Sequence, residues 1–184
     1  MRKLIAYEFL SLDGFMAGRE GQEMDFVTQR FLAEMESDIA QEYKNADTFL
    51  FGRKTYESLS QYWPNVTIKD EPLADFMNGM RKIVFSSTIS DLSWNNSKLS
   101  QVSLVEQVTT LKKEEGKNII IIGSASIIQK LTELKLIDEY KILLFPVVLG
   151  DGKPLFNRQK NAVNLNLRQT KKYNNGVLLL TYSK

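Results

Sequence analysis

The sequence predicts a three-layer α/β domain with a mostly parallel central sheet and an antiparallel hairpin near the C-terminus. Short, uniformly apolar runs alternate with helical stretches, and such runs are typical of parallel strands covered on both faces. Near the C-terminus, Asn175-Gly176 separates two strand-like segments, which is a strong hairpin signal. The 184 residues contain no repeat or long linker, so we expect a single domain over residues 1–184.

The elements of the N-terminal half follow from the spacing of apolar residues. A continuous apolar run indicates a buried strand, whereas apolar residues every three to four positions indicate a helix with one buried stripe. In chain order we expect a strand at Leu4–Leu10, a glycine-containing loop from Ser11 to Gly21, a helix from about Val27 to Tyr43, a strand at Thr48–Phe51 that stops at Gly52, and a short helix at Arg53–Leu59.

The same pattern continues in the C-terminal half and then changes. Two further apolar runs each end in small or hydroxylated residues, and the last segments alternate around the Asn-Gly pair. In chain order we expect strands at Lys82–Phe85 and Ile119–Ile122, a helix that includes Ile127 to Leu134, an apolar run at Tyr140–Val148 broken at Gly150, and the hairpin strands Val163–Lys172 and Val177–Tyr182.

Composition excludes several kinds of chemistry. The chain has no cysteine and no histidine, so zinc sites, Ser-His-Asp triads and thiol chemistry are absent, and we expect no metal. A formal net charge of +2 is too small for a nucleic-acid or anionic-membrane partner. Glu8 and Asp13 interrupt the first apolar stretch before a signal-peptide core could form. We therefore expect a cytoplasmic protein without nucleic-acid or membrane partners.

Three junctions between a strand and the segment that follows it carry small, hydroxylated or basic residues. In open α/β sheets, ligands bind beyond the carboxyl ends of the strands, where helix N-termini present free amides. One such junction is usually an ordinary helix cap, but three together favour a ligand with several phosphates, such as a dinucleotide. The Gly-x-Gly-x-x-Gly fingerprint is absent, which argues against a Rossmann site. The junctions are Gly52, Arg53, Lys54 and Thr55; Ser86, Ser87 and Thr88; and Gly123, Ser124, Ala125 and Ser126.

These residues carry a resemblance to a known family. Residues 52–59, Gly-Arg-Lys-Thr-Tyr-Glu-Ser-Leu, resemble the cofactor motif of dihydrofolate reductases. A stronger resemblance, which runs along the whole chain, is to the reductase domain of bacterial riboflavin biosynthesis, the RibD C-terminal domain, and its stand-alone relatives. It is carried by Tyr7-Glu8, Ser11–Gly14, Tyr62–Pro64, Gly123–Ser126 and Phe145–Phe156.

The resemblance implies a dihydrofolate-reductase-like fold that binds NADPH along the three junctions, and a homodimer. It places Gly52–Thr55 on phosphates, Ser86 and Ser87 beside the adenosine ribose, and Gly123–Ser126 against the pyrophosphate. The basic residues of the first junction also suit the extra phosphate of NADPH. Many relatives have arginine where this chain has Ser87. The zinc deaminase domain that accompanies this reductase in bifunctional enzymes needs histidine and cysteine, so the resemblance covers a reductase module alone.

The substrate end of the predicted site is less defined by sequence. Hydride transfer needs positioning and a proton donor, since the cofactor carries the reactive chemistry. Asp13 is the candidate catalytic and substrate-binding residue, with a simple turn as the alternative. Tyr62 and Trp63 are candidates for walling a planar heterocycle, with core packing as the alternative. Further candidates are Glu36 or Asp38 for a folate-type acid, and the Lys153 loop or Arg81-Lys82 for a substrate phosphate.

The sequence thus predicts an NADPH-dependent reductase of a small heterocyclic substrate. The resemblance implies a reaction like that of the riboflavin-pathway pyrimidine reductase, in which a ribosylamino-pyrimidine becomes its ribitylamino form. Two alternatives stay open: a dihydrofolate or pteridine reductase, and a nucleotide-binding protein that keeps the fold without turnover.

Overall fold

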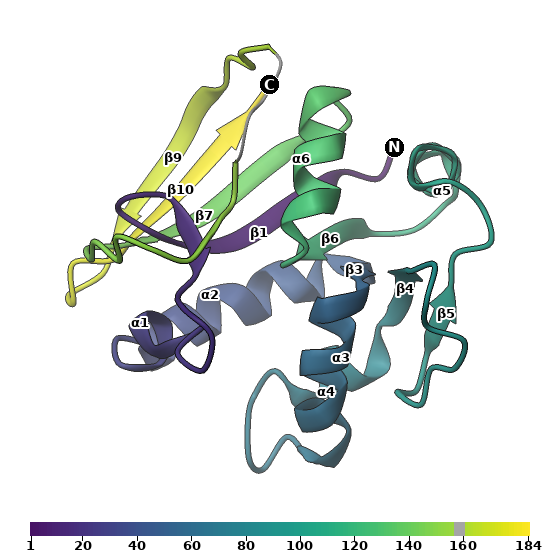
Figure 1. Ribbon diagram of the computed structural model, residues 1–184, viewed down its shortest axis with the longest axis horizontal. Coiled ribbons are helices and arrows are strands. Elements are labelled where there is room, and N and C mark those ends of the chain that lie inside the picture. The colour runs from purple at the N-terminus through teal and green to yellow at the C-terminus, as the bar shows by residue number, and fades with distance from the viewer. Residues whose placement is uncertain (157–160) are drawn as a thin grey trace.

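A computed structural model describes residues 1–156 and 161–184 and is built around one eight-stranded sheet (Figure 1). The strand order is β5-β4-β3-β6-β1-β7-β10-β9, and the strands from β5 to β7 are parallel. β10 pairs antiparallel with both of its neighbours. The predicted sheet and C-terminal hairpin are therefore confirmed. The strands are β1 (Leu4–Ser11), β3 (Ala46–Gly52), β4 (Arg81–Phe85), β5 (Ser97–Leu99), β6 (Asn118–Ile122), β7 (Glu139–Phe145), β9 (Asn166–Lys172) and β10 (Leu178–Ser183).

Helices cover both faces of the sheet, which explains the uniformly apolar strands (Figure 1). In β6, Ile120 packs on the face that carries α2, while Ile119 and Ile121 pack on the face that carries α6. The helices on the first face are α1 (Asp25–Thr28), α2 (Ala33–Lys44), α3 (Arg53–Tyr62) and α4 (Ala74–Gly79), and those on the second are α5 (Leu104–Lys113) and α6 (Ala125–Glu133).

A small ribbon crosses the carboxyl end of β1. β2 (Phe15–Ala17) pairs with β8 (Lys153–Pro154), although the two lie far apart in sequence. Gly152 has a φ of +144°, and a Cβ there would lie 2.3 Å from the Ala17 carbonyl oxygen. The close approach of these two segments therefore requires glycine.

The structure differs from the predicted elements at several places. The helix expected from Val27 to Tyr43 is divided into α1 and α2, because Leu32 is extended between them. This break lets Phe26 pack edge-on against Phe145 while α2 covers the sheet. β7 ends at Phe145 and does not continue to Val148, since proline follows and has no N–H for the ladder. α4, α5, β5 and the β2–β8 ribbon were not predicted.

Among the described residues, no helix combines the length and apolar character needed to cross a bilayer.

Candidate functional site

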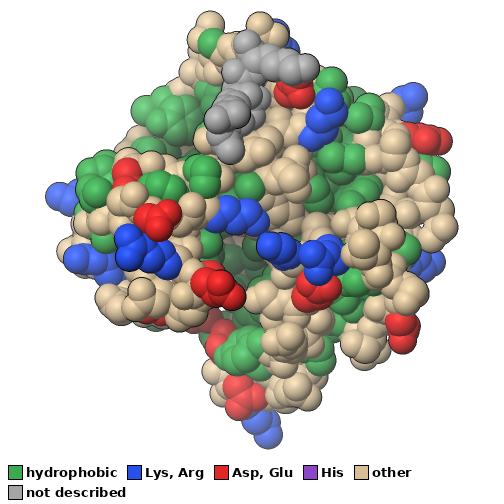
Figure 2. Space-filling view, in the orientation of Figure 1, with side chains coloured by type: hydrophobic (Ala, Val, Ile, Leu, Met, Phe, Trp, Pro, Cys, Tyr) green, Lys and Arg blue, Asp and Glu red, His purple; other side chains and the backbone are tan. Residues whose placement is uncertain are grey.

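A cavity of about 600 Å³ opens at the carboxyl edge of the sheet, where α3 and α6 begin. Figure 2 shows Lys and Arg side chains gathered around a hollow near the centre of this face. The volume lies within the range of small-molecule and cofactor sites. The cavity is lined by Gly52, Arg53, Lys54, Thr55, Phe85, Ser86, Ser87, Thr88, Ser124, Ser126, Ile127 and Lys153.

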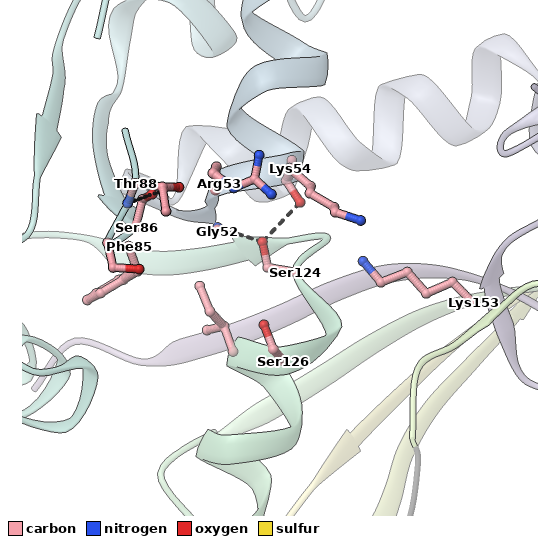
Figure 3. A pocket seen from close by; sticks show the side chains of 12 residues that line it. Gly52, Arg53, Lys54, Phe85, Ser86, Thr88, Ser124, Ser126 and Lys153 are labelled. Carbon is pink, nitrogen blue, oxygen red and sulfur yellow. Dashed lines mark hydrogen bonds between the residues drawn. The ribbon is translucent and has the colours of Figure 1, made fainter. Parts of the chain in front are cut away.

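Ser124 joins the first turns of the two helices (Figure 3). Its Oγ accepts a 2.6 Å hydrogen bond from the Gly52 amide and lies 2.9 Å from the Thr55 hydroxyl oxygen. The residue is buried, so this bridge is protected from water. The Ser124 hydroxyl therefore fixes the distance between α3 and α6, and the hydroxyls left for a ligand lie elsewhere in the cavity.

The backbone before α6 is unusual. Gly123 and Ser124 have φ values of +60° and +66°, so two successive residues adopt the left-handed conformation. A Cβ on Gly123 would lie 2.9 Å from the Thr55 hydroxyl oxygen. Such a conformation is rare for serine and is often retained at functional sites. It turns the chain into α6, whose first turn borders the cavity through Ser126 and Ile127.

Three cations surround the cavity. Arg53 pairs with Glu57 one turn along α3, at 2.9 Å, and both side chains are 41% exposed. Lys54 from α3 and Lys153 from β8 extend toward the same side of the cavity (Figure 3). Neither lysine forms an ion pair with any residue that the structure describes. The cavity therefore carries positive charge that the surrounding protein does not neutralise.

The hydroxyl groups after β4 and β6 differ in whether they form hydrogen bonds with the described part of the protein. The Ser86 Oγ accepts hydrogen bonds from the amides of Thr88 and Ile89 at 3.1 and 3.0 Å, which holds the loop after β4. Ser87 and Ser126 are exposed on the cavity wall and form no side-chain hydrogen bond with the described parts of the chain. These two hydroxyls are available to a ligand.

The predicted cofactor residues meet in this one cavity, except Gly123 and Ala125, which do not line it. Ala125 is the first residue of α6 and is buried, and Gly123 belongs to the turn that precedes this helix. The agreement follows from topology, because parallel strands end at the same edge of a sheet. Four lining residues were outside the predicted cofactor set, namely Phe85, Thr88, Ile127 and Lys153.

Asp13 lies in the turn after β1 and ties it to a second loop. Its carboxylate accepts hydrogen bonds from the Ser11 hydroxyl at 2.6 Å and from the amides of Leu149 and Gly150, the latter at 2.8 Å. The Ser11 hydrogen bond, aided by the amides, lowers the pKa of Asp13. This geometry suits an ionised loop anchor, and the catalytic role of Asp13 stays a prediction.

Tyr62 and Trp63 lie at the opposite end of α3 from the cavity. A helix rises about 1.5 Å per residue, so Tyr62 is about 13 Å along the axis from Arg53. The Tyr62 hydroxyl donates to Glu71, and the two aromatic rings meet edge-on with centroids 5.4 Å apart. Neither residue lines the cavity, and their substrate-binding role also stays a prediction.

The two candidate acids on the first long helix have different surroundings. Asp38 accepts hydrogen bonds from the Lys171 ammonium at 2.6 Å and the Tyr173 hydroxyl at 2.5 Å. Burial tends to raise the pKa of Asp38, but these two donors outweigh it and lower the pKa. Burial raises the pKa of Glu36, with a contribution from Glu71. The Asp38 carboxylate is therefore already paired with Lys171.

Arg81 and Lys82 lie at the start of β4, at the edge of the sheet remote from the cavity, which corrects their candidate role in binding a phosphate. Arg81 pairs with Glu114 at 3.4 Å. The buried Lys82 ammonium lies 4.4 Å from the centre of the Trp94 ring, and burial lowers its pKa to about 8. Its hydrogen bonds go to the backbone carbonyl oxygens of Asn78, Met80 and Asn95.

Glu8 was not predicted as a site residue, although it belongs to β1 beside the cavity. Its side chain is 4% exposed, and its Oε1 has no hydrogen-bond partner in the described residues. Burial raises the pKa of Glu8 well above its usual range, and the Gly123 amide and the Lys153 charge offset this only in part. Its position in an otherwise apolar strand was the available sequence signal.

A second cavity, of about 460 Å³, lies between the segment that follows β2, including α1, and the loop after β7. It shares no lining residue with the first cavity among the described residues. Its walls combine amide and charged side chains with apolar ones, and Arg19 pairs with Asp151 across them at 3.2 Å. The lining residues are Gly18, Arg19, Gln22, Asp25, Phe26, Gln29, Arg30, Val147, Leu149 and Asp151.

The parallel sheet and the basic, hydroxyl-lined cavity at its carboxyl edge define an α/β protein with its candidate site where open parallel sheets usually bind ligands. The chain belongs to the RibD C-terminal domain family, whose model matches residues 2–179. Relatives from Bacillus subtilis (strain 168) include the uncharacterized protein YyaP, which is 33% identical over 98% of this chain and 94% of that protein. The uncharacterized protein YwjB is 31% identical over 97% of this chain and 96% of its own length.

Solved structures share the fold. A putative riboflavin biosynthesis protein from Shewanella sp. PV-4 superposes with a TM-score of 0.80 at 22% identity, covering 98% of both chains. A diaminohydroxyphosphoribosylaminopyrimidine deaminase/5-amino-6-(5-phosphoribosylamino)uracil reductase from Thermotoga maritima has a TM-score of 0.69 at 12% identity, over 99% of this chain and 56% of that one. These likenesses confirm the dihydrofolate-reductase-like fold that the resemblance implied.

Proposed function

We propose that this protein is an NADPH-dependent reductase of a small heterocyclic substrate. The observation that carries this proposal is the single cavity that gathers three strand ends, two helix N-termini and cations without partners among the described residues. A ligand with phosphates at several points along its length would use all of these features. Family membership supports a reductase, and the Thermotoga neighbour is named as one.

The donors of the cavity fit the parts of a phosphorylated dinucleotide. The first amides of α6 and the exposed Ser126 hydroxyl suit a pyrophosphate, which a helix N-terminus attracts. Arg53, Lys54 and the Ser87 hydroxyl suit the 2′-phosphate that distinguishes NADPH from NADH, because charge-assisted hydrogen bonds favour the additional anion. Glu57 holds one guanidinium nitrogen of Arg53, so the other donors of that group remain for the phosphate.

Chemically, this chain's residues bind and orient, since a bound nicotinamide cofactor supplies the hydride. The Ser124 bridge to Gly52 and Thr55 keeps the two helix ends at a fixed separation, which sets where the phosphates lie. The β2–β8 ribbon brings Lys153 over the same cavity from a distant part of the chain. Fixed positions of this kind reduce the entropy that is lost when the cofactor and the substrate are brought together for reaction.

For the substrate, we propose a pyrimidine related to that of the riboflavin-pathway reductase. A folate-type reductase would need a carboxyl on the first long helix that faces the cavity. Asp38 is engaged by Lys171 and Tyr173, and neither Asp38 nor Glu36 lines the cavity. Oxidation of NADPH should therefore depend on a ribosylamino-pyrimidine and not on dihydrofolate. Turnover with dihydrofolate alone would contradict this choice.

The decisive experiment is a titration with NADPH and NADH that follows energy transfer from Trp63 and Trp94 to the nicotinamide. We expect NADPH to bind more tightly, and Arg53→Ala to weaken NADPH by about tenfold while NADH changes little, as expected for the loss of one charged hydrogen bond. Lys44→Ala removes an exposed lysine at the other edge of the sheet and serves as the matched control. Failure of the wild type to bind either nucleotide would refute the proposal.

We also propose a homodimer, as the resemblance implies. The outermost strand, β9, is an unpaired edge in the described structure and exposes 55% of Leu167. Light scattering of the purified protein would give the mass directly, and a monomer at micromolar concentration would contradict the proposal.

A further inference from the structure

Glu8 is a buried acid of β1 that does not line the cavity and that the proposed function does not use. Side chains alternate along a strand, so Glu8 points to the opposite face from its neighbours Tyr7 and Phe9. Those two pack on the face that carries α2, whereas Ala6 and Leu10 share the α6 face with Glu8. The carboxyl group therefore lies under the beginning of α6.

Strand register places the group more closely. Tyr7 pairs with Ile122, so Glu8 is level with Gly123, the first residue beyond β6. The Gly123 amide interacts with the Glu8 carboxyl group, and Lys153 contributes a favourable charge from the β8 side. Glu8 thus lies between the turn that starts α6 and a lysine of the cavity wall.

The other charged groups around Glu8 are few. β6 and the first turns of α6 bring none before Lys130. On β7, Lys141 pairs with Glu42 of α2, on the other face of the sheet. Tyr43 of α2 couples to Glu8, but burial raises the pKa of Tyr43, so this phenol stays neutral. Lys153 is therefore the cation available to an ionised Glu8.

We propose that Glu8 is a positioning residue that couples its proton to anion binding at the N-terminus of α6. In its neutral form it holds the Gly123 amide from below and leaves the positive end of the helix to the phosphates of the cofactor. Ionisation would place a negative charge beneath those phosphates and would also draw Lys153 toward Glu8. Both effects weaken binding of the anion. This inference rests on the proposed cofactor.

The unpartnered Oε1 and the raised pKa support the neutral form. An ionised carboxylate with a buried, unpaired oxygen is much less favourable than a neutral carboxyl in the same place. A bound phosphate adds repulsion of the same sign, so the cofactor and the proton favour each other, as linkage requires. Binding should therefore take up protons.

The test compares NADPH affinity from about pH 5 to about pH 9 in the wild type, Glu8→Gln and Glu8→Leu. We expect the affinity of the wild type relative to the variants to fall by about tenfold or more across this range, because like charges a few ångströms apart repel strongly in a partly buried site. Both variants lack the charge and should lose this component. The 2′-phosphate of NADPH titrates near pH 6 whichever protein is present. Dividing the affinity of the wild type by that of a variant at each pH therefore removes its contribution.

Two further measurements complete the test. Glu36→Gln removes another carboxyl group with a raised pKa, on the face that carries α2, and should keep the wild-type profile. Calorimetry of the wild type in buffers of different ionisation enthalpy should show proton uptake on binding, which does not depend on any variant folding.

The outcomes separate this inference from the proposed function. NADPH binding that has the same pH profile in the wild type and Glu8→Gln, or that occurs without proton uptake in the wild type, overturns the role of Glu8 and leaves the proposed cofactor intact. A folded Glu8→Gln variant that binds weakly at acidic pH would also overturn it. Absence of NADPH binding at every pH overturns both.

Discussion

The two edges of the sheet use polar residues in opposite ways. At the amino edge, the buried Arg2 guanidinium donates to the Lys117 carbonyl at 2.6 Å and the Thr48 hydroxyl at 2.9 Å, and it pairs with Asp47 and Glu114. At the carboxyl edge, the cavity retains lysines and hydroxyls without protein partners among the described residues. The polar groups at the amino edge bind one another, whereas several at the carboxyl edge have no partner among the described residues and can bind a ligand.

This contrast separates stability from function along the same strands. Removing one member of a paired polar network destabilises the fold, because the remaining buried groups lose their partners. Unpaired groups around a cavity contribute little to folding and gain their partners from a ligand. Substitutions at the two edges should therefore affect different measurements.

The largest expected effect is at the amino edge. Arg2→Ala removes the buried donor of the Lys117 carbonyl and of Asp47, whose side chain is 38% exposed, so we expect the free energy of unfolding to fall by about 3 kcal/mol. Urea denaturation measures it, with Lys44→Ala as a control that should change stability by less than about 0.5 kcal/mol. The NADPH affinity of the folded Arg2→Ala protein should be unchanged. A loss of affinity in this variant would contradict the separation of stability from binding between the two edges.

Gly123→Ala should affect both properties, because Gly123 shapes the turn before α6. Alanine would have to adopt the left-handed conformation that Gly123 has, and its Cβ would lie 2.9 Å from the Thr55 hydroxyl oxygen. We expect a loss of about 2–3 kcal/mol from strain and overpacking, together with weaker NADPH binding. Gly21→Ala is the matched control, since Gly21 also has a positive φ of +80° but nothing lies within 4 Å of the added Cβ. Equal losses in both variants would show that contact with Thr55 is unimportant.

Glu8 should make the stability of the protein depend on pH. Because its pKa is raised in the folded state, the folded protein binds this proton more tightly than the unfolded chain does. The stabilisation is full below the unfolded value of about 4.3 and is lost as the pH rises through the folded pKa. Glu8→Gln should therefore gain stability over the wild type, by about 1.4 kcal/mol for each pH unit of that window. Thermal denaturation as a function of pH would show this, and parallel curves would refute it.

Much of the fold was predictable because its signals are local. The isoleucine run of β6, the glycine after β3 and the Asn-Gly hairpin each specify an element without information from elsewhere. The cavity was predictable for a topological reason, since parallel strands bring their carboxyl ends together. α5 was not predicted, although Leu104, Val108 and Leu111 follow helical spacing and Val108 and Leu111 are buried.

The features that the sequence leaves undefined depend on contacts between distant segments. Lys153 reaches the cavity because β8 pairs with β2, and no local pattern encodes that pairing. Glu8 lies in a strand that reads as apolar, so its burial became evident only once both faces of the sheet were covered. Asp13 is saturated by amides from residues 149 and 150, which sequence spacing does not bring together.

The smallest stability effect is expected where the binding effect is large. Arg53 and Glu57 form an exposed pair one turn apart, and such pairs contribute about 0.3–0.5 kcal/mol. Arg53→Ala should therefore unfold at nearly the wild-type denaturant concentration although it binds NADPH more weakly. Lys153→Ala should behave alike, because Lys153 is exposed and has no ion-pair partner in the described part of the chain. A loss of stability above about 1 kcal/mol in either variant would mean that the carboxyl edge, like the amino edge, uses its charges for folding.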